Sequence, residues 1–289
     1  MISLVLSDID GTLIHHEPTI SHEDCQAIQE LKDAHIDFGL VSGRDIGFCR
    51  KLLHTHGLSA NCIIANNGAS LWLDDTKILE DHIEAKETIR VMRGLEEYVP
   101  LCHPFICNEQ QEFFLMKDSY AKEAQYQEAL KLLSYLGTLR QEDLISYVTK
   151  HQMPAVKISL FTYDKTNRDY LLPILKEKYP DYEVLPTSHD YIEITRKGVH
   201  KGKTLEEAMK HLGIDASEVA VIGDGWNDLP MFSRTAHSFA MAQAPDEVKK
   251  QAAYVVKNVA EVLHSVIQYN KTGSMKARKA LEGHDYGEK

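Results

Sequence analysis

The stretch LVLSDIDGTL, residues 4–13, decides the fold class of this chain of 289 residues. It opens with three apolar residues typical of a buried strand, and two carboxylates, Asp8 and Asp10, follow where that strand ends. Residues two apart on an extended backbone point to the same side, so we expect the two carboxylates to lie together. Neighbouring carboxylates resist joint ionisation unless a cation is bound or one of them holds a proton. The strand therefore ends in a candidate site for a cation and for proton transfer.

The segments after this strand alternate helical periodicity with short apolar runs. Ser21 begins a predicted helix as its N-cap, with Asp24 three residues later. The same alternation returns in the last third of the chain and predicts a parallel sheet covered by helices. The predicted helices cover residues 21–34, 44–54, 201–211, 246–250 and 260–267, and the predicted strands lie within residues 3–8, 36–43, 61–68, 218–225, 237–242 and 252–256.

The middle third has a different residue pattern. Its predicted strands are half polar, which is typical of an antiparallel sheet packed on helices along one face. Because the chain is also long for a single hydrophobic core, we predict two domains. The fold class is α/β, with a Rossmann-like parallel-sheet core over residues 1–83 plus 195–270 and an inserted α+β domain at 84–194. A charged tail at 271–289 is expected to be flexible. The inserted domain's predicted strands lie within 111–118, 154–161, 182–186 and 190–195, and its helices cover 86–98, 121–133 and 166–179.

Composition and charge argue against several classes of partner. The chain is 43% hydrophobic and 26% charged, as in an ordinary globular protein, and its formal net charge is -11. This negative charge argues against nucleic acid or an anionic membrane as a partner. No signal peptide is visible, and no apolar run reaches the roughly 18 residues that a membrane span needs. With five scattered cysteines, a reducing cytoplasm is the expected location, and no feature indicates an obligate protein partner.

Polar residues follow each predicted strand of the core where a plain turn would suffice. Ligands of open parallel sheets bind beyond the carboxyl ends of the strands, so these loops are expected to meet at one crevice. Asp224 adds a third carboxylate there, which favours a hard cation such as Mg²⁺, and Lys201 adds positive charge for an anion. One carboxylate then attacks phosphorus while the other handles the proton. The loop residues are Asp8 and Asp10; Ser42, Gly43 and Arg44; Asn66, Asn67 and Gly68; and Gly223, Asp224, Gly225, Asn227 and Asp228.

Four short segments occur in a fixed order: DIDGTL at 8–13, VSGR at 41–44, KG at 201–202 and GDGWND at 223–228. Together they resemble the four motifs of the haloacid dehalogenase-like phosphohydrolases. The NNGA segment at 66–69 and the insert after the third strand resemble the Cof-type branch with a class IIB cap. The resemblance runs from about residue 2 to residue 267.

This resemblance implies specific roles for the loop residues. Asp8 is the nucleophile that forms an aspartyl-phosphate, and Asp10 protonates the leaving oxygen and then deprotonates the attacking water. Asp8, the backbone carbonyl of Asp10 and Asp224 hold Mg²⁺, and the inserted domain is a cap that closes over the substrate. The phosphate oxygens are held by Ser42, Lys201 and Asn227 together with backbone amides near Ile9 and Gly43, and the supporting residues are Asp228, Arg44 and Asn67.

Some positions depart from the family pattern or allow two interpretations. Ser42 stands where relatives usually carry threonine; it either binds phosphate or caps the next helix. Arg44 either contacts substrate or forms a surface salt bridge. Gln243 in MAQA replaces the asparagine of the common MxNA pattern, and Trp226 is unusual within its motif. The segment CHPFIC, residues 102–107, fits a strand better than a zinc site, because no second pair of ligands accompanies it.

The expected function is a Mg²⁺-dependent phosphatase acting on a small phosphorylated metabolite. A sugar phosphate and a phosphorylated cofactor, such as flavin mononucleotide or pyridoxal phosphate, both fit this class. One alternative is a phosphomutase, since class IIB relatives include phosphomannomutases. The other is a metal-dependent phosphoryl-accepting signalling domain, against which Asp10 as a proton shuttle and the large cap argue.

Overall fold

The computed structural model describes residues 1–15, 17–108, 113–116, 139–142 and 144–279. The chain divides into two compact units, here called the core unit and the inserted unit. The core unit combines Met1–Leu79 with His200–Lys289, and the inserted unit is Glu80–Val199. In the described part of the chain, no helix combines the length and apolar character needed to cross a membrane.

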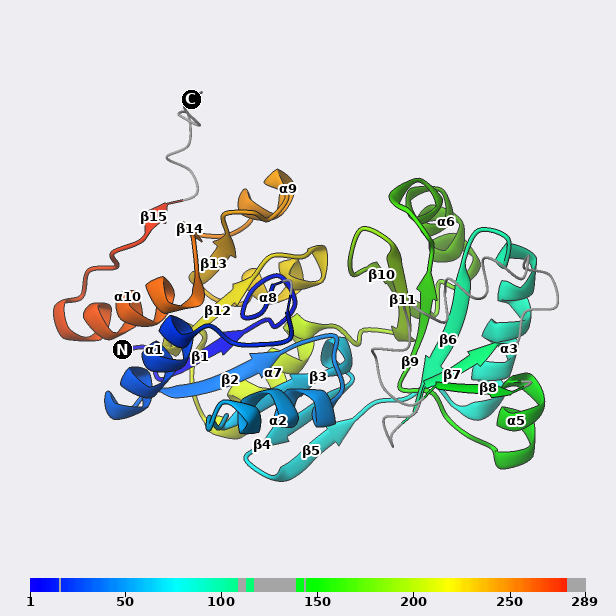
Figure 1. Cartoon of the computed structure of the whole chain (residues 1–289), viewed down its shortest axis with the longest axis horizontal. Helices are drawn as coiled ribbons and strands as arrows, with labels where there is room; N and C mark the ends of the chain where they lie inside the picture. The colour runs from blue at the N-terminus through cyan, green and yellow to red at the C-terminus, as the bar shows by residue number, and fades with distance from the viewer. Residues whose placement is uncertain (16, 109–112, 117–138, 143, 280–289) are drawn as a thin grey trace. The chain divides into compact units, whose positions relative to one another are not determined.

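The core unit contains a sheet with the strand order β15-β14-β13-β12-β1-β2-β3-β4-β5 over the described residues (Figure 1). The six strands from β14 to β3 in this order are parallel, whereas β4 and β15 run antiparallel to their neighbours β3 and β14. The predicted parallel sheet is therefore confirmed. The strands are β1 Leu4–Ser7, β2 Asp37–Val41, β3 Cys62–Ala65, β4 Ser70–Leu73, β5 Thr76–Glu80, β12 Val219–Gly223, β13 His237–Met241, β14 Tyr254–Val256 and β15 Arg278–Lys279.

Helices cover both faces of this sheet, which explains why its strands read as continuous apolar runs. On β1, Val5 belongs to the hydrophobic cluster with α1, α2 and α10, while Leu4 and Leu6 belong to the cluster with α7, α8 and α9. The helices α1 and α10 lie against each other (Figure 1). The helices are α1 His22–Asp33, α2 Ile46–Thr55, α7 Lys201–Leu212, α8 Leu229–Phe232, α9 Asp246–Lys249 and α10 Val259–Thr272.

Side-chain caps set the starts of the first two helices. Ser21 caps α1 as predicted, since its Oγ accepts a hydrogen bond from the backbone N–H of Asp24 at 3.0 Å. The start of α2 differs from the prediction. Asp45 caps it by accepting from the N–H of Phe48 at 2.9 Å, so the helix begins at Ile46 rather than Arg44. The carboxylate of Asp45 therefore performs the role that the pattern also allowed for Ser42.

The inserted unit contains a second sheet, with the described strands in the order β10-β11-β9-β6-β7-β8. All neighbours are antiparallel except β7 and β8. An aliphatic core that includes Ile106, Ile158 and Ile194 packs this sheet against α3, α5 and α6. The strands are β6 His103–Cys107, β7 Phe113–Met116, β8 Leu139–Glu142, β9 Lys157–Phe161, β10 Tyr182–Pro186 and β11 Tyr191–Arg196, and the helices are α3 Ala85–Leu95, α5 Leu144–His151 and α6 Lys165–Lys178.

Several elements of the structure were not predicted. These are β4, β5, α8 and β15 in the core unit and β8 and α5 in the inserted unit. The helix predicted at 121–133 lies outside the described residues. The segment CHPFIC contains β6, whose five residues are all buried, as the strand interpretation predicts.

The predicted charged tail differs from the structure over its first nine residues, 271–279. The helix α10 continues to Thr272 and ends at Gly273, whose left-handed φ of 71° suits glycine. The chain then returns, because Ser265 Oγ donates to the carbonyl of Lys276 at 2.8 Å and β15 pairs with β14. Met275 and Ala277 also pack against the core cluster. Residues 280–289 of the predicted tail lie outside the described residues.

Candidate active site

Lys201 and Asp8 form a buried ion pair at the end of β1. Lys201 is the first residue of α7, and its side chain has an exposed fraction of 0%. Its Nζ lies 2.6 Å from Oδ1 of Asp8 and 2.6 Å from Oδ1 of Asp228. One ammonium group is thus shared by carboxylates from two loops.

Asp228 also organises the loop that contains Asp224. Its Oδ2 accepts hydrogen bonds from the backbone N–H of Asp224 at 2.9 Å and of Gly225 at 2.8 Å. Gly223 has no space for a side chain, since a Cβ there would lie 2.4 Å from the Asp228 carboxyl group. The loop therefore wraps tightly around the Asp228 carboxylate.

Three carboxylates lie close enough to share one cation. Asp8, Asp224 and Asp228 each offer one oxygen, and these atoms all lie within 4.8 Å of one another. Thr12 Oγ1 donates to Oδ1 of Asp224 at 2.9 Å and fixes that carboxylate. A set of carboxylate oxygens suits a hard cation such as Mg²⁺.

The electrostatics of this cluster favour the binding of a cation. Burial, reinforced by the charges of Asp228 and Asp224, raises the pKa of Asp8 well above its usual value despite the neighbouring Lys201. Burial and the Asp228 charge also raise the pKa of Asp224 to about 7. Burial alone lowers the pKa of Lys201, but Asp228 and Asp8 outweigh it and the net pKa is raised, so Lys201 remains an ammonium. A divalent cation next to Asp8 and Asp224 would compensate the charges of these carboxylates.

Asp10 points to a different partner. Its Oδ1 and Oδ2 accept from Nη2 of Arg44 at 2.6 Å and from Nε at 2.8 Å, and the guanidinium lies over the Phe48 ring at 4.6 Å from the centroid. Of the two interpretations of Arg44, the structure contains the salt bridge, and its partner is Asp10. The Asp10 side chain has an exposed fraction of 45%, so it lies at the surface of the core unit rather than within the carboxylate cluster.

Asn67 joins three of the predicted loops. Its Oδ1 accepts from Nδ2 of Asn227 at 2.9 Å, and its backbone N–H donates to the carbonyl of Ser42 at 2.9 Å. Ser42 is fully buried, and its Oγ accepts from the N–H of Arg44 at 3.1 Å. Asn67 has a left-handed φ of 56°, a conformation that asparagine tolerates better than most residues. A Cβ on Gly43 would lie 3.1 Å from Asn67 Nδ2, so this loop also lies against Asn67.

Two glycines allow other parts of the core unit to approach the start of α7 closely. A Cβ on Gly68 would lie 2.6 Å from the carbonyl carbon of His200, and one on Gly202 would lie 2.2 Å from the carbonyl oxygen of Pro230. Thr204 Oγ1 donates to the carbonyl of Gly68 at 2.6 Å. These close approaches hold the start of α7, and hence Lys201, in place.

The remaining predicted residues are also placed. The side chain of Ile9 is buried in the core, and its carbonyl accepts from the N–H groups of Leu13 and Ile14, both at 2.9 Å. Trp226 is half-buried and packs against the hydrophobic cluster beneath α7. Thr12, which no prediction included, is the residue that holds Asp224. Its only sequence signal is its position directly after the DIDG segment.

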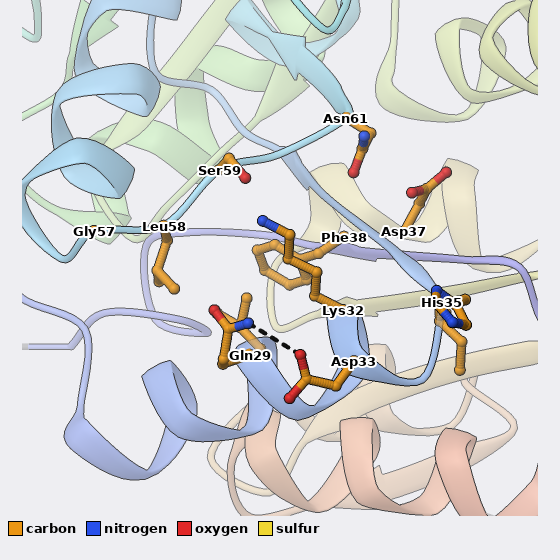
Figure 2. A pocket seen from close by; sticks show the side chains of 12 residues that line it. Gln29, Lys32, Asp33, His35, Asp37, Phe38, Gly57, Leu58, Ser59 and Asn61 are labelled. Carbon is orange, nitrogen blue, oxygen red and sulfur yellow. Dashed lines mark hydrogen bonds between the residues drawn. The ribbon is translucent and has the colours of Figure 1, made fainter.

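A cavity of about 600 Å³ lies at the opposite end of the core strands (Figure 2). It is bordered by the end of α1, the start of β2 and the loop before β3, and Lys32, Asp37 and Asn61 are among its lining residues. No predicted site residue lines it. The cavity therefore has no part in the chemistry at the carboxyl ends of the strands.

Comparison with known proteins identifies the family. The family model described as haloacid dehalogenase-like hydrolase matches residues 5–269. The chain belongs to the haloacid dehalogenase-like hydrolases. Among curated relatives of this chain, the 5-amino-6-(5-phospho-D-ribitylamino)uracil phosphatase YcsE of Bacillus subtilis (strain 168) is 26% identical over 254 residues, covering 88% of this chain and 89% of the relative. YbjI of Escherichia coli (strain K12), which carries the same phosphatase name, is 27% identical over 261 residues, covering 88% of this chain and 90% of the relative.

A solved structure of a haloacid dehalogenase-like hydrolase confirms the fold. The subclass IIB sugar phosphatase BT4131 superimposes with a TM-score of 0.73 at 20% identity, covering 92% of this chain and 99% of that chain. The predicted family, the α/β fold and the enzyme class, a phosphatase of the haloacid dehalogenase-like hydrolases, are thereby confirmed, and the likeness to the subclass IIB structure is one of fold.

Proposed function

We propose that the chain is a Mg²⁺-dependent phosphatase that hydrolyses a small phosphorylated metabolite through an aspartyl-phosphate on Asp8. The observation that carries the proposal is the contact of Asp8 with Lys201 beside Asp224, because it combines a nucleophile, a fixed positive charge and a cation-binding carboxylate. Nucleophilic catalysis by a carboxylate needs this charge compensation, since the phosphoryl group is itself anionic.

Asp8, Asp224 and the backbone carbonyl of Asp10 are the proposed Mg²⁺ ligands. Asp228 supports them from the side, since its oxygens already accept hydrogen bonds from Lys201 and from two backbone N–H groups. When bound, Mg²⁺ supplies positive charge that lets an anionic phosphoryl group approach a carboxylate. The oxygen donor set and the raised pKa values of Asp8 and Asp224 both support a divalent cation here.

The residues of the chain then carry two steps. In the first, a carboxylate oxygen of Asp8 forms a bond to phosphorus while the ester P–O bond breaks, and Asp10 gives its proton to the leaving oxygen. In the second, Asp10 takes a proton from water, whose oxygen bonds to phosphorus as the bond to Asp8 breaks. The phosphate oxygens are bound in both steps by Lys201, Ser42 and Asn227 with the backbone amides of Ile9 and Gly43. Arg44 orients the Asp10 carboxylate through its two hydrogen bonds, and Asn67 orients Asn227.

The names of the relatives suggest which metabolites to test. Two curated relatives are named phosphatases of 5-amino-6-(5-phospho-D-ribitylamino)uracil, and the solved relative is named a sugar phosphatase. The phosphorylated ribityl-uracil, sugar phosphates, flavin mononucleotide and pyridoxal phosphate are therefore the proposed substrate panel. A cytoplasmic location, and partners limited to such metabolites, stay predictions.

The test is the release of inorganic phosphate by the purified chain. We expect hydrolysis of p-nitrophenyl phosphate and of at least one panel member with Mg²⁺, its loss in EDTA, and its loss in Asp8→Asn. The matched control is Asp33→Asn, an exposed aspartate at the end of α1, which should retain wild-type activity. Metal-independent hydrolysis, or full activity in Asp8→Asn, would overturn the proposal.

Two further measurements distinguish the alternatives. A phosphomutase would convert a sugar phosphate to its isomer with little free phosphate. A phosphoryl-accepting signalling domain would retain a long-lived aspartyl-phosphate after treatment with acetyl phosphate. Either result would replace the proposed phosphatase activity with that alternative.

A further inference from the structure

Gln243 reaches the catalytic turn from a strand that is not adjacent to β1. It lies two residues after β13, and its Nε2 donates to the carbonyl oxygen of Gly11 at 2.7 Å. In the sheet, β12 separates β13 from β1. The hydrogen bond therefore crosses the end of β12, the strand that Asp224 follows.

Gly11 lies directly against the Asp224 carboxylate. A Cβ on Gly11 would lie 2.2 Å from Oδ2 of Asp224, and the φ of Gly11 is 84°, a left-handed value that suits glycine. Its N–H donates to the carbonyl of Ile14 at 2.8 Å. Ile14 therefore fixes one side of the Gly11 backbone and Gln243 fixes the other.

Thr12 links the Gly11 backbone to the carboxylate of Asp224. Thr12 Oγ1 donates to Oδ1 of Asp224 at 2.9 Å, and the carbonyl that Gln243 binds belongs to the peptide group between Gly11 and Thr12. A rotation of that peptide group would displace the Thr12 hydroxyl from Asp224. The Gln243 hydrogen bond opposes this rotation.

We propose that Gln243 is a positioning residue that holds Gly11 and Thr12 so that Asp224 meets Asp8 in a geometry ready for the cation. The inference rests on the proposed Mg²⁺ site of this phosphatase. A neutral donor suits the position, because a second lysine here would compete with the cation for the carboxylates, and a glutamate would repel the Gly11 carbonyl. Gln243 itself is exposed and contributes little buried surface, so its removal should spare the fold.

The test compares Gln243→Met, which keeps the length of the side chain and removes the donor, with Gln251→Met. Gln251 is an exposed glutamine eight residues later and has no place in the proposed machinery. Two quantities are measured without substrate: the Tm of the metal-free protein, and the Mg²⁺ concentration that gives half of the metal-induced rise in Tm. Phosphate release against Mg²⁺ concentration is measured separately.

In Gln243→Met we expect an unchanged metal-free Tm and about a fivefold higher half-saturating Mg²⁺ concentration, the size set by one hydrogen bond. Gln251→Met should match the wild type in both. An unchanged half-saturating Mg²⁺ concentration in Gln243→Met, with or without a lower metal-free Tm, would overturn the inference. The proposed phosphatase function would be unaffected by that result. A wild-type protein that neither responds to Mg²⁺ nor releases phosphate would overturn the proposed function first, and the inference with it.

Discussion

The Nζ atom of Lys201 lies 2.6 Å from Oδ1 of Asp8, and both side chains are buried within the core unit. The same ammonium contacts Asp228, and Asp224 adds a further carboxylate within 4.8 Å. Three carboxylates therefore face one ammonium, and the excess negative charge is the driving force that we assign to cation binding.

Replacing Lys201 should damage both stability and catalysis. Lys201→Met leaves Asp8 and Asp228 buried without their shared cation, so we expect the free energy of unfolding to fall by about 3 kcal/mol. Phosphate release should fall at least about 100-fold, because a fixed charge at the transferring group is lost. Urea denaturation and p-nitrophenyl phosphate turnover measure the two effects. Lys203→Met, at an exposed position on the same helix, is the control and should change neither. Activity within about threefold of wild type would contradict the role of Lys201.

Stability of the metal-free protein should fall as pH rises from about 4 to about 7. Burial and the Asp228 charge raise the folded-state pKa of Asp224 to about 7, against a usual value of 3.8, so the folded state binds more protons than the unfolded state across this window. The stabilisation from protonated Asp224 is fully present below about pH 4 and is lost as the pH rises through about 7. For Asp224 the whole loss amounts to about 4 kcal/mol, of which about 3 kcal/mol falls between pH 5 and pH 8. Urea unfolding in EDTA at pH 5 and pH 8 measures it.

The matched variant for this pH effect is Asp224→Asn, which has the same shape and no titrating group. We expect it to be more stable than wild type at pH 8 in EDTA and to have a flatter pH profile. Mg²⁺ should restore the stability of the wild type at pH 8 and leave the variant unchanged. If wild type and variant have parallel pH profiles, Asp224 does not carry the excess charge.

Arg44 should affect catalysis more than stability. Arg44→Met removes both hydrogen bonds to the Asp10 carboxylate, but Asp10 lies at the surface, where ion pairs contribute at most about 1 kcal/mol. We expect unfolding to change by less than that amount and kcat to fall about 10-fold, because the proton-transfer group loses its orientation. Arg44→Lys should restore part of the activity, since one hydrogen bond can re-form. Equal kcat in all three proteins would show that Asp10 needs no orientation by Arg44.

The sequence predicted the elements whose signals are local. The apolar run of β1 and the Ser21 cap of α1 are of this kind, and both are confirmed. It failed where two local signals compete. Ser42 and Asp45 both fit the start of α2, and only the backbone path shows that Asp45 is the residue beyond which the helix forms. The strands β5 and β8 were missed because they are short and mostly polar, and β4 was missed although it contains the apolar run at residues 71–73.

For the site, the motifs predicted which residues occur in the loops, but not which atoms bond to which. Asn67 and Asn227 are 160 positions apart, and Gly11 and Gln243 are 232 apart. No spacing in a single sequence encodes such a contact, because it depends on the order of strands in the folded sheet. The same reason explains why the partner of Arg44 became known only from the structure.

The buried pair of Lys157 and Glu193 in the inserted unit should be strongly coupled. Nζ and Oε1 lie 2.7 Å apart, and the side chains are only 8% and 9% exposed. Lys157→Met alone should cost about 3 kcal/mol of unfolding free energy, because it removes the ammonium that lies 2.7 Å from a buried carboxylate, whereas adding Glu193→Met should recover most of that loss. The exposed pair Arg196 and Asp81, also 2.7 Å apart, is the control, with an expected coupling below about 1 kcal/mol. Urea denaturation of the two double-mutant cycles measures both couplings, and equal values would show that burial does not set the strength of this pair.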